Sequence, residues 1–162
     1  DGADLGSFSV GGAGYGPFAV LFDGTNIWTS NYNNNSITKL TTAGGLVGTY
    51  AVGTNPRGLG FDGTRIWAAN ANSTNVTVRN VSDGSLVTTI ALPGFNQPHG
   101  FVYDGVNMWV CAVLNPRMAV IDPNTFTILD NFDTALGSGN WCLVFDGANV
   151  WTDGIDGLLQ IL

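Results

Sequence analysis

Phe61-Asp62-Gly63-Thr64-Arg65-Ile66-Trp67 is one of four variants of the same heptapeptide in this chain of 162 residues. The other variants begin at Phe22, Tyr103 and Phe145, and all four combine an aromatic residue, Asp-Gly, two variable residues, an apolar residue and Trp. Successive aspartates of the repeat are 39, 42 and 42 residues apart. A period of this length indicates one supersecondary unit that is built four times.

The period and the turn together predict the architecture. Propeller blades of four strands repeat with this spacing, and Asp-Gly suits a tight hairpin because Gly reaches positive φ without strain. We therefore expect an all-β fold, a β-propeller of four four-stranded blades in a single domain. The expected blades are residues 17–55, 56–97 and 98–139, with 140–162 plus 1–16 as the fourth.

Each blade is expected to be an up-and-down meander. The expected strands are 18–22, 26–31, 35–41 and 46–52, then 57–61, 65–70, 74–80 and 85–91, then 99–103, 107–113, 116–121 and 125–131, and finally 141–145, 149–153 and 157–162. Counting from Asp146 to Leu162 and on from Asp1 to Asp23 gives 39 residues, the shortest internal period. Residues 5–10 also resemble 46–52, so we expect this N-terminal strand to complete the last blade.

Charge and hydropathy narrow the class of partner. The net charge is −7, Glu is absent, and eight of the twelve aspartates precede Gly, so most of the acidity belongs to turns. Four arginines and one lysine do not make the basic patch that nucleic acid or an anionic membrane requires. No apolar run approaches the roughly 20 residues of a membrane span, and we expect no membrane insertion. The many Asn, Thr, Ser and Gly residues favour a secreted protein or one on a cell or virion surface.

The repeated residues have a structural interpretation. We expect the aspartates to shape turns and the tryptophans to fill the wedge between neighbouring blades, with a sugar-stacking platform on each blade as the alternative. These structural repeat residues are Asp23, Trp28, Asp62, Trp67, Asp104, Trp109, Asp146 and Trp151.

One position of the repeat varies without an evident packing reason. Aligned on the repeat, the starts of the four innermost strands carry Phe18, Arg57, His99 and Trp141. In a propeller these starts open onto one end of the central channel, where functional variation is expected. The four residues are therefore candidate binding residues, and the alternative is that they plug a narrow channel.

The segment from Pro56 to Asn70 follows the pattern Pro-x-Gly-hydrophobic-x-Phe-Asp-Gly-x-x-Ile-Trp-x-x-Asn. This resembles the YVTN, NHL and streptogramin-lyase-like propeller repeats of bacterial and phage proteins, and the resemblance covers nearly the whole chain. It implies a binding or scaffold domain, usually of six or seven blades rather than four. Its lyase members use a histidine in a metal-assisted elimination, for which His99 is the candidate by position.

Other chemical motifs are sparse. His99 is the only histidine, no Gly-x-Ser-x-Gly motif is present, and no phosphate-binding glycine loop leads into a helix. We therefore expect no cofactor, and His99 is only a weak catalytic candidate. Asp153 and Asp156 are weak metal candidates, because the remaining carboxylates of a calcium loop are missing.

The two cysteines form a candidate inter-blade disulfide. Cys111 ends the second strand of the third blade and Cys142 begins the first strand of the fourth. In an antiparallel meander these two ends lie at the same rim, in a chain that looks extracellular. Two buried free thiols are the alternative.

Three functions remain open from the sequence. The sequence favours a non-enzymatic interaction or structural module of a secreted or surface assembly, with a protein or glycan as partner. The second is a lectin-like glycan binder at the blade rims, and the third is a lyase or hydrolase at the channel mouth that uses His99. Self-association through the N-terminal strand or another sheet edge is also compatible with the repeat.

Overall fold

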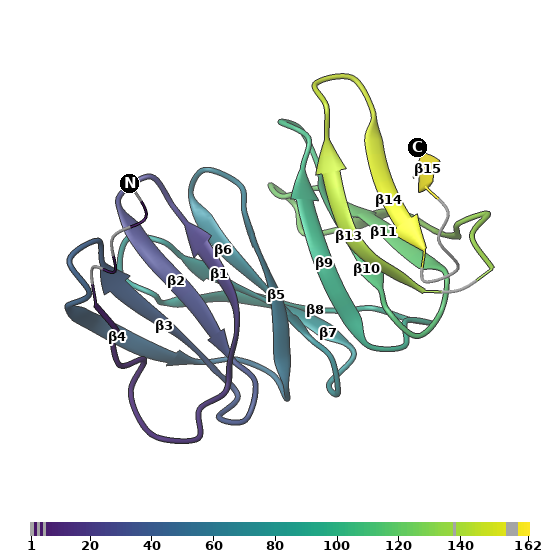
Figure 1. Cartoon of the computed structure of the whole chain (residues 1–162). Coiled ribbons are helices and arrows are strands. Elements are labelled where there is room, and N and C mark those ends of the chain that lie inside the picture. The colour runs from purple at the N-terminus through teal and green to yellow at the C-terminus, as the bar shows by residue number, and fades with distance from the viewer. Residues whose placement is uncertain (1, 3, 5, 138, 155–158) are drawn as a thin grey trace.

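The computed structural model describes residues 2, 4, 6–137, 139–154 and 159–162 (Figure 1). These residues form fifteen strands in four antiparallel sheets, which confirms the all-β prediction. Three sheets have four strands and the last has three, and each sheet follows chain order. In the described part of the chain, no helix is long and apolar enough to cross a membrane.

Each sheet corresponds to one blade of the sequence repeat. The first two blades contain β1 (Pro17–Phe22), β2 (Asn26–Asn31), β3 (Ser36–Thr41), β4 (Leu46–Ala51), β5 (Pro56–Phe61), β6 (Arg65–Asn70), β7 (Asn75–Asn80) and β8 (Leu86–Ala91). The last two contain β9 (Pro98–Tyr103), β10 (Met108–Ala112), β11 (Arg117–Ile121), β12 (Ile128–Asp133), β13 (Asn140–Phe145), β14 (Val150–Gly154) and β15 (Leu159–Ile161).

The strand β12 begins later than the sequence predicts. The expected strand covers 125–131, whereas β12 spans Ile128–Asp133. In the preceding turn Asp122 accepts hydrogen bonds from the amide of Asn124 at 2.8 Å and the hydroxyl of Thr125 at 2.9 Å, and Phe126 has a φ of 60°. A left-handed residue does not continue a strand, so pairing starts after this turn.

The N-terminal segment does not complete the last blade in this structure. Within the described residues, 6–10 form no strand and lie against the first blade, where the Thr38 hydroxyl donates to the Val10 carbonyl at 2.7 Å. The Phe8 ring packs on Gly44, at a point where no Cβ would fit. Gly11 has a φ of 128°, so the segment bends over the blade instead of extending as a strand.

A carboxylate joins the turn and the tryptophan in every blade. One oxygen of each repeated aspartate accepts hydrogen bonds from two turn amides, and the other accepts one from the indole Nε1 five residues later. The indole distances are 2.7 Å for Asp23–Trp28, 2.9 Å for Asp62–Trp67, 2.7 Å for Asp104–Trp109 and 2.7 Å for Asp146–Trp151. This bond locks the orientation of each ring relative to its hairpin.

The locked rings face the following blade. Trp28 belongs to an apolar cluster against which Leu59 and Phe61 of the second blade pack, and Trp67 belongs to one against which Phe101 of the third blade packs. Both indoles are fully buried, so at these positions the tryptophans fill the wedge between blades as expected. The innermost strands follow one another, with β1 against β5, β5 against β9 and β9 against β13 (Figure 1).

Candidate functional site

The structure brings the four variable side chains of the innermost strands together. Phe18, Arg57, His99 and Trp141, here called the inner-strand cluster, each occupy the second residue of β1, β5, β9 or β13. A cavity of about 300 Å³ lies between these strands, and Phe18, His99 and Trp141 are among its walls. The sequence repeat therefore predicts which residues meet here.

A backbone irregularity shared by all four blades exposes this position. The pairing of each innermost strand with its neighbour shifts register directly after the first residue, as between Pro17 and Val20. Such a bulge releases a residue from the ladder and redirects its side chain. The freed amides find other acceptors: Ala19 donates to Ser30 Oγ at 3.1 Å.

Aromatic contacts connect the members of the cluster. His99 meets Phe18 edge to face, with ring centroids 5.6 Å apart and planes at 80°, and its centroid lies 5.3 Å from that of Trp141. The guanidinium of Arg57 lies 5.7 Å from the Phe18 ring and 5.8 Å from the Tyr32 ring, within the range of cation–π attraction. Tyr32 directly follows β2, and the sequence alignment on β1, β5, β9 and β13 did not assign it to this cluster.

His99 is held as a neutral imidazole with a free acceptor. Its Nδ1 lies 2.9 Å from the carbonyl oxygen of Trp141, and because a carbonyl only accepts, Nδ1 carries the hydrogen. Burial lowers the pKa of His99 below 6.5 and the nearby charge of Arg57 lowers it further, which outweighs the opposing effects of the Trp141 carbonyl and Asp153. In the neutral ring Nε2 is therefore unprotonated, and it is buried with no hydrogen-bond partner among the described residues.

Arg57 presents a buried donor in the same cluster. Its Nε is also buried and has no hydrogen-bond partner in the described part of the chain. The main chain at Arg57 is anchored, since its carbonyl accepts a hydrogen bond of 2.5 Å from Ser30 Oγ. The cluster thus combines a free cationic donor, a free neutral acceptor and aromatic surface.

The weak metal candidates have other functions or lie outside the described residues. Asp153 Oδ1 accepts hydrogen bonds from the amides of Trp141 and Cys142, at 3.1 and 2.7 Å, and so supports the bulge of β13. Asp156 lies outside the described residues. No group of three or more His, Cys, Asp or Glu side chains suited to a metal occurs among the residues that the structure describes.

The predicted disulfide is absent, and both thiols are free. Cys111 is buried and its thiol lies 3.3 Å from the carbonyl of Asn140, to which it donates. Burial raises the pKa of Cys111 to about 12, so the group is inert. Cys142 is exposed on the fourth blade, so the two thiols have different surroundings.

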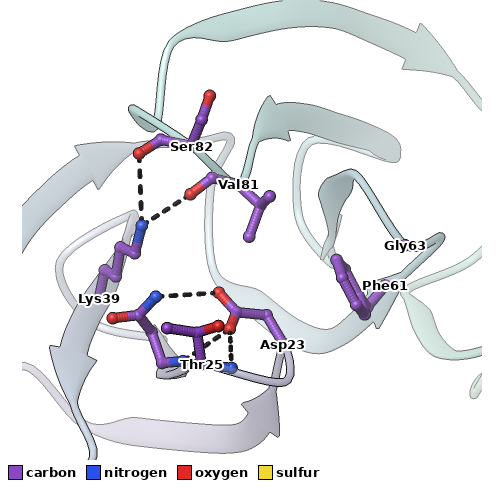
Figure 2. A pocket seen from close by; sticks show the side chains of 8 residues that line it. Asp23, Thr25, Lys39, Phe61, Gly63, Val81 and Ser82 are labelled. Carbon is purple, nitrogen blue, oxygen red and sulfur yellow. Dashed lines mark hydrogen bonds between the residues drawn. The ribbon is translucent and has the colours of Figure 1, made fainter.

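A second pocket, of about 340 Å³, lies between the first two blades (Figure 2). Figure 2 shows Lys39 reaching across it, where its ammonium donates to the carbonyls of Val81 at 2.7 Å and Ser82 at 3.4 Å. The same ammonium lies 5.2 Å from the centroid of the buried Trp28 ring. Lys39 therefore joins blade one to blade two, and this pocket is structural.

Comparisons with known proteins identify the class of fold. No protein-family model and no curated protein matches the sequence. Among solved structures, the computationally designed Ika4 protein is similar, with a TM-score of 0.81 and 17% identity over 100% of this chain and 98% of that one. Streptogramin B lyase has a TM-score of 0.79 and 18% identity over 95% of this chain and 56% of its own. Hydrazine synthase from Kuenenia stuttgartiensis has a TM-score of 0.80 and 21% identity over 99% of this chain.

These likenesses, together with the repeated blades, define a β-propeller fold built from repeats. The chain spans only about half of the hydrazine synthase chain, 49% of its length. At such identities the likeness concerns the fold alone.

Proposed function

We propose that this protein is a non-enzymatic interaction module of a secreted or surface assembly, and that the inner-strand cluster binds a peptide segment of a partner protein. The proposal rests on one observation: Arg57 Nε and His99 Nε2 are buried without hydrogen-bond partners beside three aromatic rings. Buried polar atoms are normally paired, and leaving them unpaired costs stability. A ligand that pairs with both atoms offsets that cost. Membership of the NHL and YVTN type of propeller repeats is part of the same proposal.

The chemistry of the cluster suggests the bound group. Arg57 favours a carboxylate, because a guanidinium donates to carboxylates in strong, charge-assisted hydrogen bonds. The rings of Phe18 and Trp141 favour an aromatic side chain. His99 Nε2 accepts one hydrogen bond, which a peptide N–H supplies. The preferred ligand is therefore an aromatic residue next to an acidic one.

Glycan binding at the blade rims has less support. A lectin with one site on each blade needs exposed aromatic rings at the repeated positions, whereas Trp28 and Trp67 are fully buried. Their indole N–H groups are also bonded to the turn aspartates and are not free for a sugar hydroxyl. If the rims were the site, glycan binding on an array would be unaffected by substitutions in the inner-strand cluster.

A lyase or hydrolase is the second candidate, and His99 favours it. The neutral imidazole is oriented by the Trp141 carbonyl and has its Nε2 lone pair free, as a general base requires. Turnover of any candidate substrate that His99→Gln abolishes, while binding is retained, would support the enzyme over the interaction module.

A displayed peptide library that covers aromatic and acidic pairs tests the proposal directly. We expect selected peptides to bind the wild-type protein and to lose at least about tenfold in affinity for Arg57→Ala, since a charge-assisted hydrogen bond is lost. Arg117→Ala is the matched control, because Arg117 pairs with Asp133 at 3.1 Å in the third blade, away from the cluster. Equal loss in both variants, or selected peptides that bind both variants as well as wild type, would contradict the proposal.

A further inference from the structure

The first three blades of this chain stack by one rule. The side of a blade that bears its repeated tryptophan, here called the trailing face, packs on the opposite side of the next blade, here called the leading face. Trp28 on the trailing face of blade one shares an apolar cluster with Ile66 and Ala68 of blade two, and Leu59 and Phe61 on the leading face of blade two pack against this cluster. Trp67 meets Phe101 of blade three in the same way.

The trailing face of blade four is apolar and exposed. Pairing places Val144, Trp151 and Ile161 opposite one another on this face, and Leu159 shares it because it lies two residues before Ile161. Val144, Leu159 and Ile161 are 59%, 71% and 52% exposed. Ile161 is the third-strand residue that pairs with Trp151. In the other three blades the residue that pairs in this way with the repeated tryptophan is buried; these residues are Lys39, Val78 and Val120.

The leading face of blade one is exposed in a corresponding way. Val20 and Phe22 alternate with Leu21, which faces blade two, and they are 74% and 56% exposed. Their counterparts in the second blade are Leu59 and Phe61, and both pack against the preceding blade. One chain thus has an unmatched trailing face on blade four and, along β1, an unmatched part of the leading face of blade one.

These two faces do not meet within the chain. The packing of innermost strands runs from β1 to β5, β9 and β13, while β1 and β13, both fully described, do not pack on each other in the same way. Figure 1 shows the first blade and β15 on opposite sides of the molecule. Residues 6–10 of the same chain already lie over Thr38, which shares the leading face of blade one with Val20. Val20 and Phe22 stay exposed, so whatever covers them and the trailing face of blade four comes from outside the chain.

We propose that two copies of this chain associate head to tail, with the trailing face of blade four of each copy on the leading face of blade one of the other. A two-fold axis relates the two contacts, so the assembly closes without leaving either face free. The trailing face has a cavity of about 230 Å³ lined by Val144, Trp151 and Leu159, and it receives Phe22 as the Trp28 side of blade one receives Phe61. Two of the similar structures are about twice as long as this chain, which spans 49% of hydrazine synthase and 56% of streptogramin B lyase, whereas Ika4 has nearly the same length.

Sedimentation equilibrium of the full chain tests the assembly. We expect the wild-type protein to have the mass of two chains. Val20→Lys and Leu159→Asp should each raise the dimer dissociation constant by at least about a hundredfold, because each variant dimer buries two unpaired charges. Leu129→Asp is the matched control, since Leu129 is also an exposed outer-strand leucine, 57% exposed, but belongs to blade three, whose neighbours are both present. This control should remain a dimer.

Mixing the two variants separates the proposal from simple loss of folding. A dimer of Val20→Lys with Leu159→Asp has one unchanged contact and one contact with opposite charges, so the mixture should associate more strongly than either variant alone. Near-ultraviolet circular dichroism checks that each variant is folded, and Val20→Thr, which keeps a β-branched residue, replaces Val20→Lys if that variant is not. A wild-type protein with the mass of one chain, an open series of larger species, or no recovery on mixing folded variants would overturn the proposal.

Discussion

Asp23→Asn changes one atom of the first turn, and we expect it to lower the free energy of unfolding by about 1.5–3 kcal/mol. Asp23 Oδ1 accepts from the amides of Thr25 and Asn26 at 2.8 and 2.6 Å, while Oδ2 accepts from the indole of Trp28 at 2.7 Å. Asparagine has one oxygen and one NH₂ group. Its NH₂ group, which is a donor, must therefore face either the two backbone N–H groups or the indole N–H, which are donors as well. The Trp28 ring is fully buried, and water therefore does not replace the lost acceptor.

The loss should depend on pH in a defined direction. Burial raises the pKa of Asp23, but the hydrogen bonds from Trp28, Asn26 and Thr25 outweigh this effect and the pKa lies below 3.8. The unfolded chain then binds the proton more readily than the folded protein does. The stabilisation from this carboxylate is present above pH 3.8 and is lost as the pH falls through the folded-state pKa. The difference between wild type and Asp23→Asn should shrink in the same range.

Urea unfolding of both proteins at neutral and acidic pH measures these differences. Asp146→Asn is the internal comparison, because it breaks the same bond where Trp151 is only partly buried and water can reach the indole. We expect a smaller loss for Asp146→Asn than for Asp23→Asn. A change within about 0.5 kcal/mol for Asp23→Asn, which is ordinary for a surface substitution, would refute the reasoning, as would a larger loss at Asp146.

Three further predictions concern single side chains. Burial lowers the pKa of His99 in the folded protein below 6.5. The contribution of His99 to stability is therefore complete above pH 6.5 and is lost as the pH falls through its folded-state pKa. His99→Gln should flatten the pH dependence of urea unfolding below pH 6.5. Iodoacetamide should label Cys142 in the folded Leu159→Asp variant, where the cavity that Cys142 lines is open, and Cys111 only after unfolding, and intact mass shows this; a folded variant with no reactive thiol would contradict two free cysteines. Lys39→Met should lower the free energy of unfolding in urea by about 1–3 kcal/mol, since two carbonyls of blade two lose their donor. An unchanged urea midpoint would contradict the role of Lys39 as a link between blades.

The repeat was enough to predict the sheets and the members of the inner-strand cluster. Asp-Gly fixed the first hairpin of each blade, and the alternation around the tryptophans placed most strands to within about two residues. Equivalent positions in the repeat then brought Phe18, Arg57, His99 and Trp141 to one place. These features depend on local sequence and on the regular repetition of the blade.

Features that depend on particular contacts could not be predicted in this way. The Asp–Trp hydrogen bond was missed, although the constant spacing of five residues was its visible signal. The path of residues 6–10 depends on the Thr38 hydroxyl and on the space over Gly44, and neither is a feature of the repeat. Tyr32 stacks on Phe18 of the cluster but directly follows β2. An alignment of the innermost strands β1, β5, β9 and β13 does not include this position.

The bulge at the start of each innermost strand also bears on how such a protein changes over time. Side-chain acceptors hold the freed amides, with Ser30 Oγ bound by Ala19 and Asp153 Oδ1 bound by Trp141 and Cys142, so the side chain that follows the first residue contributes little to the frame. The same backbone irregularity occurs in all four blades, although the side chain at this position differs; the four residues are Phe18, Arg57, His99 and Trp141. Recognition properties can therefore be rewritten one blade at a time, by single substitutions that leave the scaffold intact, and the same independence makes these four positions suitable for laboratory selection of new specificities.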